Sequence, residues 1–186
     1  SNSDHRLGLL YQWGYGDPSI SYSSNAVAIY YDATTPSPWS DHNNTKIIGT
    51  ASDTWNSNQG PCPSGWRLPS SAEFVILCAD KTASSCWVDS GTYAGNTGYA
   101  GAEFFGANPD KTPGTGVFFP ATGYRSYTDG TASVRGAQGR YWASNIPSKN
   151  HAYYLFFRYD PAALNPEGNY ERANCFPVRC VAVPTV

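Results

Sequence analysis

Residues 60–77 read GPCPSGWRLPSSAEFVIL and set a cysteine and a tryptophan directly before a predicted helix. Ser70 is followed three residues later by Glu73, which is the pattern of a capping box at a helix N-terminus. Phe74 and Leu77 then recur at helical spacing, and the proline before Ser70 prevents the helix from extending backward. We therefore predict a helix that begins at Ser70.

The composition indicates a loop-rich secreted domain. The 186 residues include Gly 18, Pro 14, Trp 6, Tyr 14 and Phe 8. Turns need glycine and proline, and aromatic side chains bury a large area per residue. Only 14% of the residues are charged and the net charge is −2, so we expect no nucleic-acid partner. We expect one domain over residues 1–186, in which residues 1–6 are flexible or not native.

No apolar run approaches the roughly 18 residues that a membrane-spanning helix needs. We therefore expect no membrane span in this chain. The chain lacks methionine even at its first position, so we expect a mature or trimmed product. A removed signal peptide or a lipid anchor ahead of residue 1 is compatible with this expectation.

The five cysteines favour disulfides over a metal site. They lack the paired CxxC spacing of a zinc site, and the three histidines are scattered. Cys78 and Cys86 flank a short polar segment that a disulfide would close, and we expect Cys62 to bridge either Cys175 or Cys180. The alternative is that some of the cysteines are buried thiols, which pack as small apolar groups. The odd number leaves one thiol unpaired in any case.

The remaining pattern predicts strands and one more helix. We expect a strand that ends near Trp13, a strand at residues 27–31 and a second short helix around residues 100–107. Aromatic and β-branched runs between turn residues then predict strands within residues 116–126, 132–145, 151–159 and 175–183. Short strands with tight connections favour antiparallel pairing. We predict an α+β fold with one or two helices on a twisted antiparallel sheet and long irregular loops.

One passage, residues 25–63, is too long for an ordinary connection. Loops of this length carry function or are ordered by side-chain contacts of their own. Trp39 and Trp55 are candidates for either role.

Six motifs together resemble a known family. They are YQWG (11–14), PCPSGWRLPSSAEF (61–74), FFPATGYRS (118–126), GRYWASN (139–145), AYYLFF (152–157) and PVRCV (177–181). Their order and spacing resemble the Fibrobacter succinogenes major paralogous domain, a family of bacterial exported domains. The GWRLPSSAEF and VRCV pieces are also similar to elements of formylglycine-generating-enzyme-like domains, which implies a C-type-lectin-like fold.

The resemblance implies a disulfide between Cys62 and Cys180 that joins the start of the helix to the last strand. Trp66 is then expected to be a core residue beneath this disulfide. We expect Arg67 to pair with a carboxylate or with backbone carbonyls.

We expect neither an enzyme nor a cofactor. Cys175 and Cys180 are spaced like the copper-holding pair of formylglycine-generating enzymes, but Cys180 belongs to the terminal strand motif, and the segment that carries that pair is missing. The sequence also has no G-x-S-x-G elbow, HExxH motif or phosphate loop. Residues 41–45 and 160–171 cluster oxygen side chains suited to calcium, but without the signatures of calcium-dependent lectins we interpret them as solvated turns.

The favoured hypothesis is recognition at the bacterial cell surface. Members of the resembled family are exported lipoproteins or surface and fimbria-associated proteins, which implies an extracellular adhesion or binding module anchored to the outer membrane or to a fimbria. A glycan or extracellular-matrix protein is the expected ligand, because aromatic faces pack on sugars and guanidinium groups bind hydroxyls. The candidate ligand-binding residues are Trp39, Trp55, Tyr93, Tyr99, Arg125, Tyr127 and Arg135.

Two alternatives remain. Each of these side chains is instead suited to packing its own loop or the sheet. The chain as a whole is also suited to be a structural subunit of a fimbria or pilus that acts only through contacts with other surface proteins.

Overall fold

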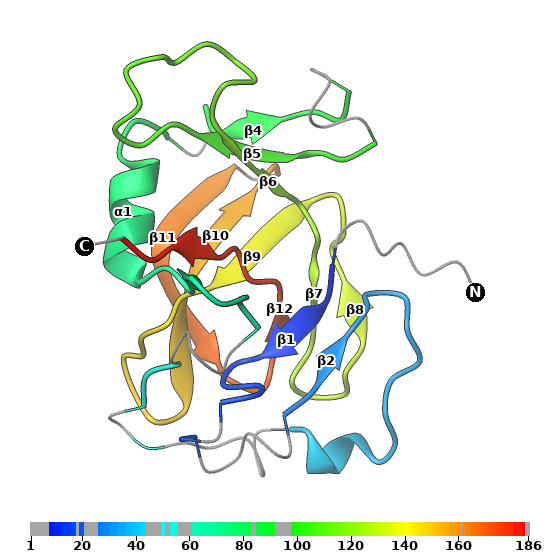
Figure 1. Cartoon of the computed structure of the whole chain (residues 1–186). Helices are drawn as coiled ribbons and strands as arrows, with labels where there is room; N and C mark the ends of the chain where they lie inside the picture. The colour runs from blue at the N-terminus through cyan, green and yellow to red at the C-terminus, as the bar shows by residue number, and fades with distance from the viewer. Residues whose placement is uncertain are drawn as a thin grey trace.

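The computed structural model describes residues 8–17, 19–20, 26–43, 50, 53–55, 61–82, 85–91, 98–160 and 162–184. Strands make up 32% of these residues and helices only 7%. The strands form four antiparallel sheets arranged as a half-barrel (Figure 1). The predicted α+β, C-type-lectin-like fold is therefore wrong, and the chain is mostly β-sheet. The predicted flexible residues 1–6 lie outside the described part of the chain.

The largest sheet places the N-terminal strand beside strands from the second half of the chain. Its members in spatial order are β2 (Ala28–Ile29), β1 (Leu10–Gln12), β12 (Cys175–Phe176), β7 (Tyr124–Arg125) and β8 (Ala132–Ser133). Because β1 pairs with β12, segments far apart in the sequence lie side by side. The strands predicted before Trp13 and within residues 27–31 are confirmed.

Three smaller sheets complete the fold. The central one consists of β9 (Gln138–Trp142), β10 (His151–Arg158) and β11 (Ala163–Glu171). A second, at one end of the molecule, consists of β4 (Trp87–Val88), β5 (Gly101–Phe104) and β6 (Val117–Pro120). The third is a two-stranded ribbon of β3 (Trp66–Arg67) and β13 (Val181–Ala182).

Strands β9 and β10 of the central sheet carry buried side chains on both faces. Side chains alternate between the two faces of a strand. Trp142 on one face belongs to a core cluster with Phe176, where the rings stack with centroids 4.1 Å apart. Phe157 on the other face packs in a second cluster with Phe104 and Phe119. The sheet thus separates two aromatic cores.

The predicted helix at Ser70 is confirmed as α1 (Ser71–Cys78). The Ser70 hydroxyl accepts a hydrogen bond from the Glu73 N–H, and the Glu73 carboxylate accepts one from the Ser70 N–H at 2.8 Å. These two bonds satisfy donors that a helix N-terminus otherwise leaves open. Phe74 points into the second core, which docks α1 against the central sheet (Figure 1).

Two interpretations from the sequence are wrong. Residues 100–107 form no helix in the structure, because β5 lies between β4 and β6 and all four of its residues are buried. Within the segment 160–171, residues 163–171 are not a solvated turn, because they form β11, the longest strand in the described chain. Its Pro166 is tolerated because β11 is an edge strand with an irregular register at that point.

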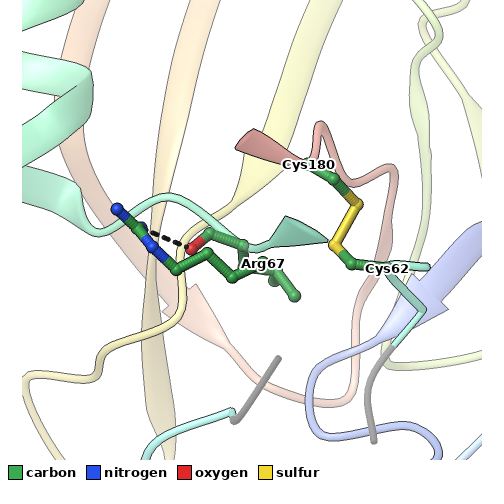
Figure 2. The surroundings of a disulfide bond; sticks show 4 residues. Cys62, Arg67 and Cys180 are labelled. Carbon is green, nitrogen blue, oxygen red and sulfur yellow. Dashed lines mark hydrogen bonds between the residues drawn. A yellow bond between two sulfur atoms is a disulfide. The ribbon is translucent and has the colours of Figure 1, made fainter. Parts of the chain in front are cut away.

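The disulfide that the family resemblance implies is formed. Cys62 and Cys180 are joined across a sequence separation of 118 residues, next to the β3–β13 ribbon (Figure 2). The predicted disulfide between Cys78 and Cys86 is not formed, and both are buried thiols of the second core. Burial raises the pKa of Cys78 to about 12, so this side chain packs as an uncharged apolar group.

Replacing both Cys62 and Cys180 by serine is expected to lower the free energy of unfolding by about 5 kcal/mol. The disulfide closes a long loop, and its removal restores the entropy of the unfolded chain. Chemical denaturation in non-reducing buffer measures the difference. Reductant should lower the stability of the native chain to that of the double variant and leave the variant unchanged. Equal stability of the two proteins without reductant would contradict the prediction.

Candidate functional site

An apolar groove of about 480 Å³ lies beside the disulfide, between α1, the β5–β6 hairpin and β13. We call it the disulfide groove. Its main lining side chains are Trp66, Ile76, Phe105, Val117, Arg179 and Ala182. The groove therefore combines segments from three parts of the chain that the disulfide and α1 bring together.

Large apolar side chains around the groove are exposed to solvent. The exposed fraction is 46% for Trp66, 62% for Ile76 and 38% for Val117. Ile76 is exposed because α1 carries apolar residues on more than its core-facing side, whereas Phe74 is buried in the core. Scattered exposed apolar residues are ordinary, but a cluster around a concave surface is typical of an interaction site.

The prediction that Trp66 is a core residue is wrong. Trp66 lies directly opposite Ala182 in the β3–β13 ribbon, so the two side chains share one face, and both line the disulfide groove. Leu68, two residues later, is buried in the core in its place. The tryptophan next to the disulfide thus belongs to the surface of the groove.

Arg67 and Glu73 form a bidentate ion pair at the edge of the groove. The Arg67 Nη1 and Nη2 atoms donate to the Glu73 Oε2 and Oε1 atoms at 2.7 and 2.6 Å. Arg67 also donates to the backbone carbonyl of Leu68, the bond drawn as a dashed line in Figure 2. Both predicted kinds of partner, a carboxylate and a backbone carbonyl, are therefore present. The hydrogen bonds from Arg67 lower the pKa of Glu73 to about 2. The negative charge of Glu73 is therefore already compensated within the protein.

Arg179 contributes a positive charge to the groove that, unlike the charge of Glu73, is not held in an ion pair among the described residues. The side chain is exposed, lines the groove and places its guanidinium carbon 5.7 Å from the ring centroid of Phe119. Within the residues that the structure describes, its guanidinium forms no ion pair and no hydrogen bond. The groove thus offers one uncompensated positive charge on an apolar background.

One family model, described as a domain of unknown function (DUF8237), matches residues 100–181. The chain is similar to that domain over this segment. No curated protein and no solved structure matches the chain. The matched segment supplies Val117 and Arg179 to the groove, whereas Trp66 and α1 lie ahead of it.

The structure describes all of the predicted ligand-binding residues except Tyr93, which is outside the described residues. None of the described ones belongs to the lining of the disulfide groove. Trp39 and Trp55 are buried, so neither offers an aromatic face to a ligand. Trp55 packs edge-on against Trp13 with ring centroids 5.7 Å apart. Tyr99 is partly buried just before β5.

Four of the predicted ligand-binding residues order the long passage that contains Trp39. They are Trp39 itself, Arg125, Tyr127 and Arg135. Arg125 is buried and donates to the carbonyls of Tyr30, Tyr31, Ala33 and Gly130. The Trp39 indole donates to the Tyr127 carbonyl at 2.9 Å, and Arg135 pairs with Asp32 at 2.8 Å. Together they fasten residues 30–39 to the β7–β8 hairpin. Their observed contacts are therefore those of loop packing.

Tyr127 also belongs to a partly exposed aromatic cluster. Its ring lies 6.2 Å from Tyr170, and the Arg140 guanidinium lies 4.0 Å from the ring centroid of Tyr124. The Arg140 Nε and Nη1 atoms are buried beneath these rings, out of reach of a bound molecule. The geometry here is that of a cation packed among aromatic rings.

In the segments that the structure describes, no three His, Cys, Asp or Glu side chains gather into a possible metal site. Cys180 is held in the disulfide, and burial raises the pKa of Cys175 to about 12. The same segments contain no helix long and apolar enough to cross a membrane.

Replacing Arg125 by methionine is expected to destabilise the protein by about 3 kcal/mol or more, because several buried carbonyls lose their donor. Arg135→Met is the matched control, since it breaks a partly exposed ion pair worth less than about 1 kcal/mol. Thermal and denaturant unfolding of both variants checks the difference. Similar losses for the two would show that the loop does not depend on Arg125.

Replacing Glu73 by glutamine keeps a capping side chain but removes the charge. We expect a loss of about 1 kcal/mol at pH 7, reduced by the partial exposure of the pair. A lowered carboxylate pKa contributes stability above its usual value of 4.5, which is lost as the pH falls through about 2. The stability difference between the two proteins should therefore vanish toward pH 2. A difference that persists there would assign the loss to the cap and not to the charge.

Proposed function

We propose that this chain is an exported binding module that holds a partner protein in the disulfide groove at the bacterial cell surface. The observation that carries the proposal is the cluster of exposed Trp66, Ile76 and Val117 side chains around a concave surface. When a partner covers exposed apolar surface of this kind, the removal of that surface from water favours the complex. The disulfide supports an oxidising, extracellular location.

The lining of the groove favours a protein over a glycan. A glycan requires several hydrogen-bonding groups that match its hydroxyls, whereas the main polar side chains here are Glu73, which is paired, and Arg179. The remaining lining is mostly aliphatic and aromatic, which suits the side chains of a protein segment. We therefore propose adhesion through protein contact.

The lining also favours recognition over catalysis. Its carboxylate is held by Arg67, and its cysteine sulfur is bonded to Cys62. Acid–base or nucleophilic chemistry needs a group whose proton or electron pair is available to a substrate. The groove is thus better suited to bind a partner than to transform one.

The test is binding of the purified chain to an array of extracellular-matrix proteins, bacterial surface proteins and glycans. We expect saturable binding to a protein, weakened roughly tenfold or more by Ile76→Gln, because burial of a large aliphatic side chain is lost. Val75→Gln is the matched control: Val75 is the neighbour of Ile76 on α1 and is 39% exposed, but it lies outside the groove lining.

The outcome separates the possibilities. Binding that Ile76→Gln weakens and Val75→Gln spares supports the disulfide groove as the site. Binding that both variants leave unchanged would place the site elsewhere. An array without any bound partner would overturn the proposal. Circular dichroism of the three proteins confirms that each is folded.

A further inference from the structure

We infer that the disulfide groove accepts an extended peptide segment that carries a carboxylate and adds as a strand to the outer edge of β13. This inference rests on the proposed function and specifies the partner's chemistry. It is carried by three observations: an open strand edge, an uncompensated arginine and an apolar lining, all at the same groove.

The open edge follows from the hydrogen-bond pattern of the ribbon. The Val183 N–H donates to the Gly65 carbonyl at 2.9 Å, and Val181 lies opposite Arg67. Residues that bond the partner strand alternate with residues whose N–H and C=O point the other way. The N–H and C=O of Ala182 therefore point away from β3. Within the described chain β13 has no second neighbouring strand.

The open edge lies at the groove. Ala182 is exposed and contributes to the lining together with Val181. In Figure 1 β13 is the red strand that crosses in front of the central sheet toward α1, with β6 above it. A chain segment laid along this edge would lie in the groove and satisfy the Ala182 N–H and C=O, as in other cases of strand addition.

The charge of the groove specifies an acidic group on this segment. Arg179 comes three residues before Ala182 and has no partner for its guanidinium among the described residues. Glu73, the carboxylate of the lining, is held by two hydrogen bonds from Arg67 and so leaves the charge of Arg179 uncompensated. A guanidinium binds a carboxylate through two parallel hydrogen bonds, which are stronger than bonds between neutral groups.

The apolar lining specifies the residues beside the acidic one. Alternate side chains of an added strand face the same way. Those directed into the groove would contact Ile76, Val117 and Trp66, which are exposed in the protein alone. The expected segment therefore has apolar residues at alternate positions and a carboxylate near one end.

The test uses acetylated and amidated hexapeptides of alternating valine and threonine, with one glutamate placed at each position in turn and a glutamine twin for each peptide. Isothermal titration with the whole chain measures the dissociation constants. We expect at least one glutamate peptide to bind roughly tenfold or more tightly than its glutamine twin. N-methylation of alternate backbone nitrogens in that peptide should weaken binding at one set of positions, where the strand pairs with Ala182, and not at the other.

Variants of the protein assign the effect. Arg179→Gln should abolish the preference for glutamate, and Arg179→Lys should keep part of it. The matched control is Lys149→Gln, which removes an exposed cation outside the groove lining and should leave the preference intact. Glutamate and glutamine twins that bind equally, or a preference that survives Arg179→Gln, would overturn the inference.

The failure of this inference is distinct from the failure of the proposed function. If no peptide binds while a protein on the array is still held in a way that Ile76→Gln weakens, the groove is the site and the acidic strand is wrong. If a glycan is the only ligand sensitive to Ile76→Gln, the acidic strand is also wrong. If neither the peptides nor the array show binding, both proposals fail.

Discussion

The disulfide between Cys62 and Cys180 is the constraint on which the rest of the groove depends. A ribbon with two residues in each strand has too few hydrogen bonds to persist alone. The covalent bond holds β3 against β13, and the capping box starts α1 at Ser71, close after β3. The positions of Trp66 and of the open edge of β13 therefore depend on this bond, while Phe74 docks α1 beside them.

Buried arginines supply a comparable constraint for the irregular parts of the chain. Arg172 is fully buried, stacks on Trp13 with its guanidinium carbon 4.5 Å from the ring and donates to Asp53 and to the carbonyls of Thr50 and Ser148. Arg125 likewise donates to backbone carbonyls within residues 30–33. Segments without regular structure must find partners for their backbone polar groups, and an arginine with five donors can serve several of them at once.

The extent to which the sequence predicts this structure depends on the range of the interactions involved. The helix at Ser70 depends on residues three apart, and the early strands depend on local alternation, so both were predicted correctly. The fold class was wrong because the residues of β5 and β11 lack a clear alternation of apolar side chains, and pairing with β4, β6 and β10 makes them strands. Trp66 was misplaced because its exposure depends on pairing with Ala182, more than a hundred residues later. Trp39 and Arg125, which we predicted as ligand-binding residues, do lie in one region of the structure. Their hydrogen bonds, however, go to backbone carbonyls of the loops that they order.

The disulfide also relates the proposed recognition to an oxidising compartment. The β5–β6 side of the groove and Arg179 lie in the segment similar to the domain of unknown function, whereas Trp66 and α1 lie outside it. The Cys62–Cys180 bond joins these two parts of the chain directly at the groove. Reduction to two thiols would remove the covalent link between the two strands of the short ribbon. Such disulfides form mainly in oxidising compartments. A groove that depends on a disulfide therefore agrees with the export that we propose for this chain.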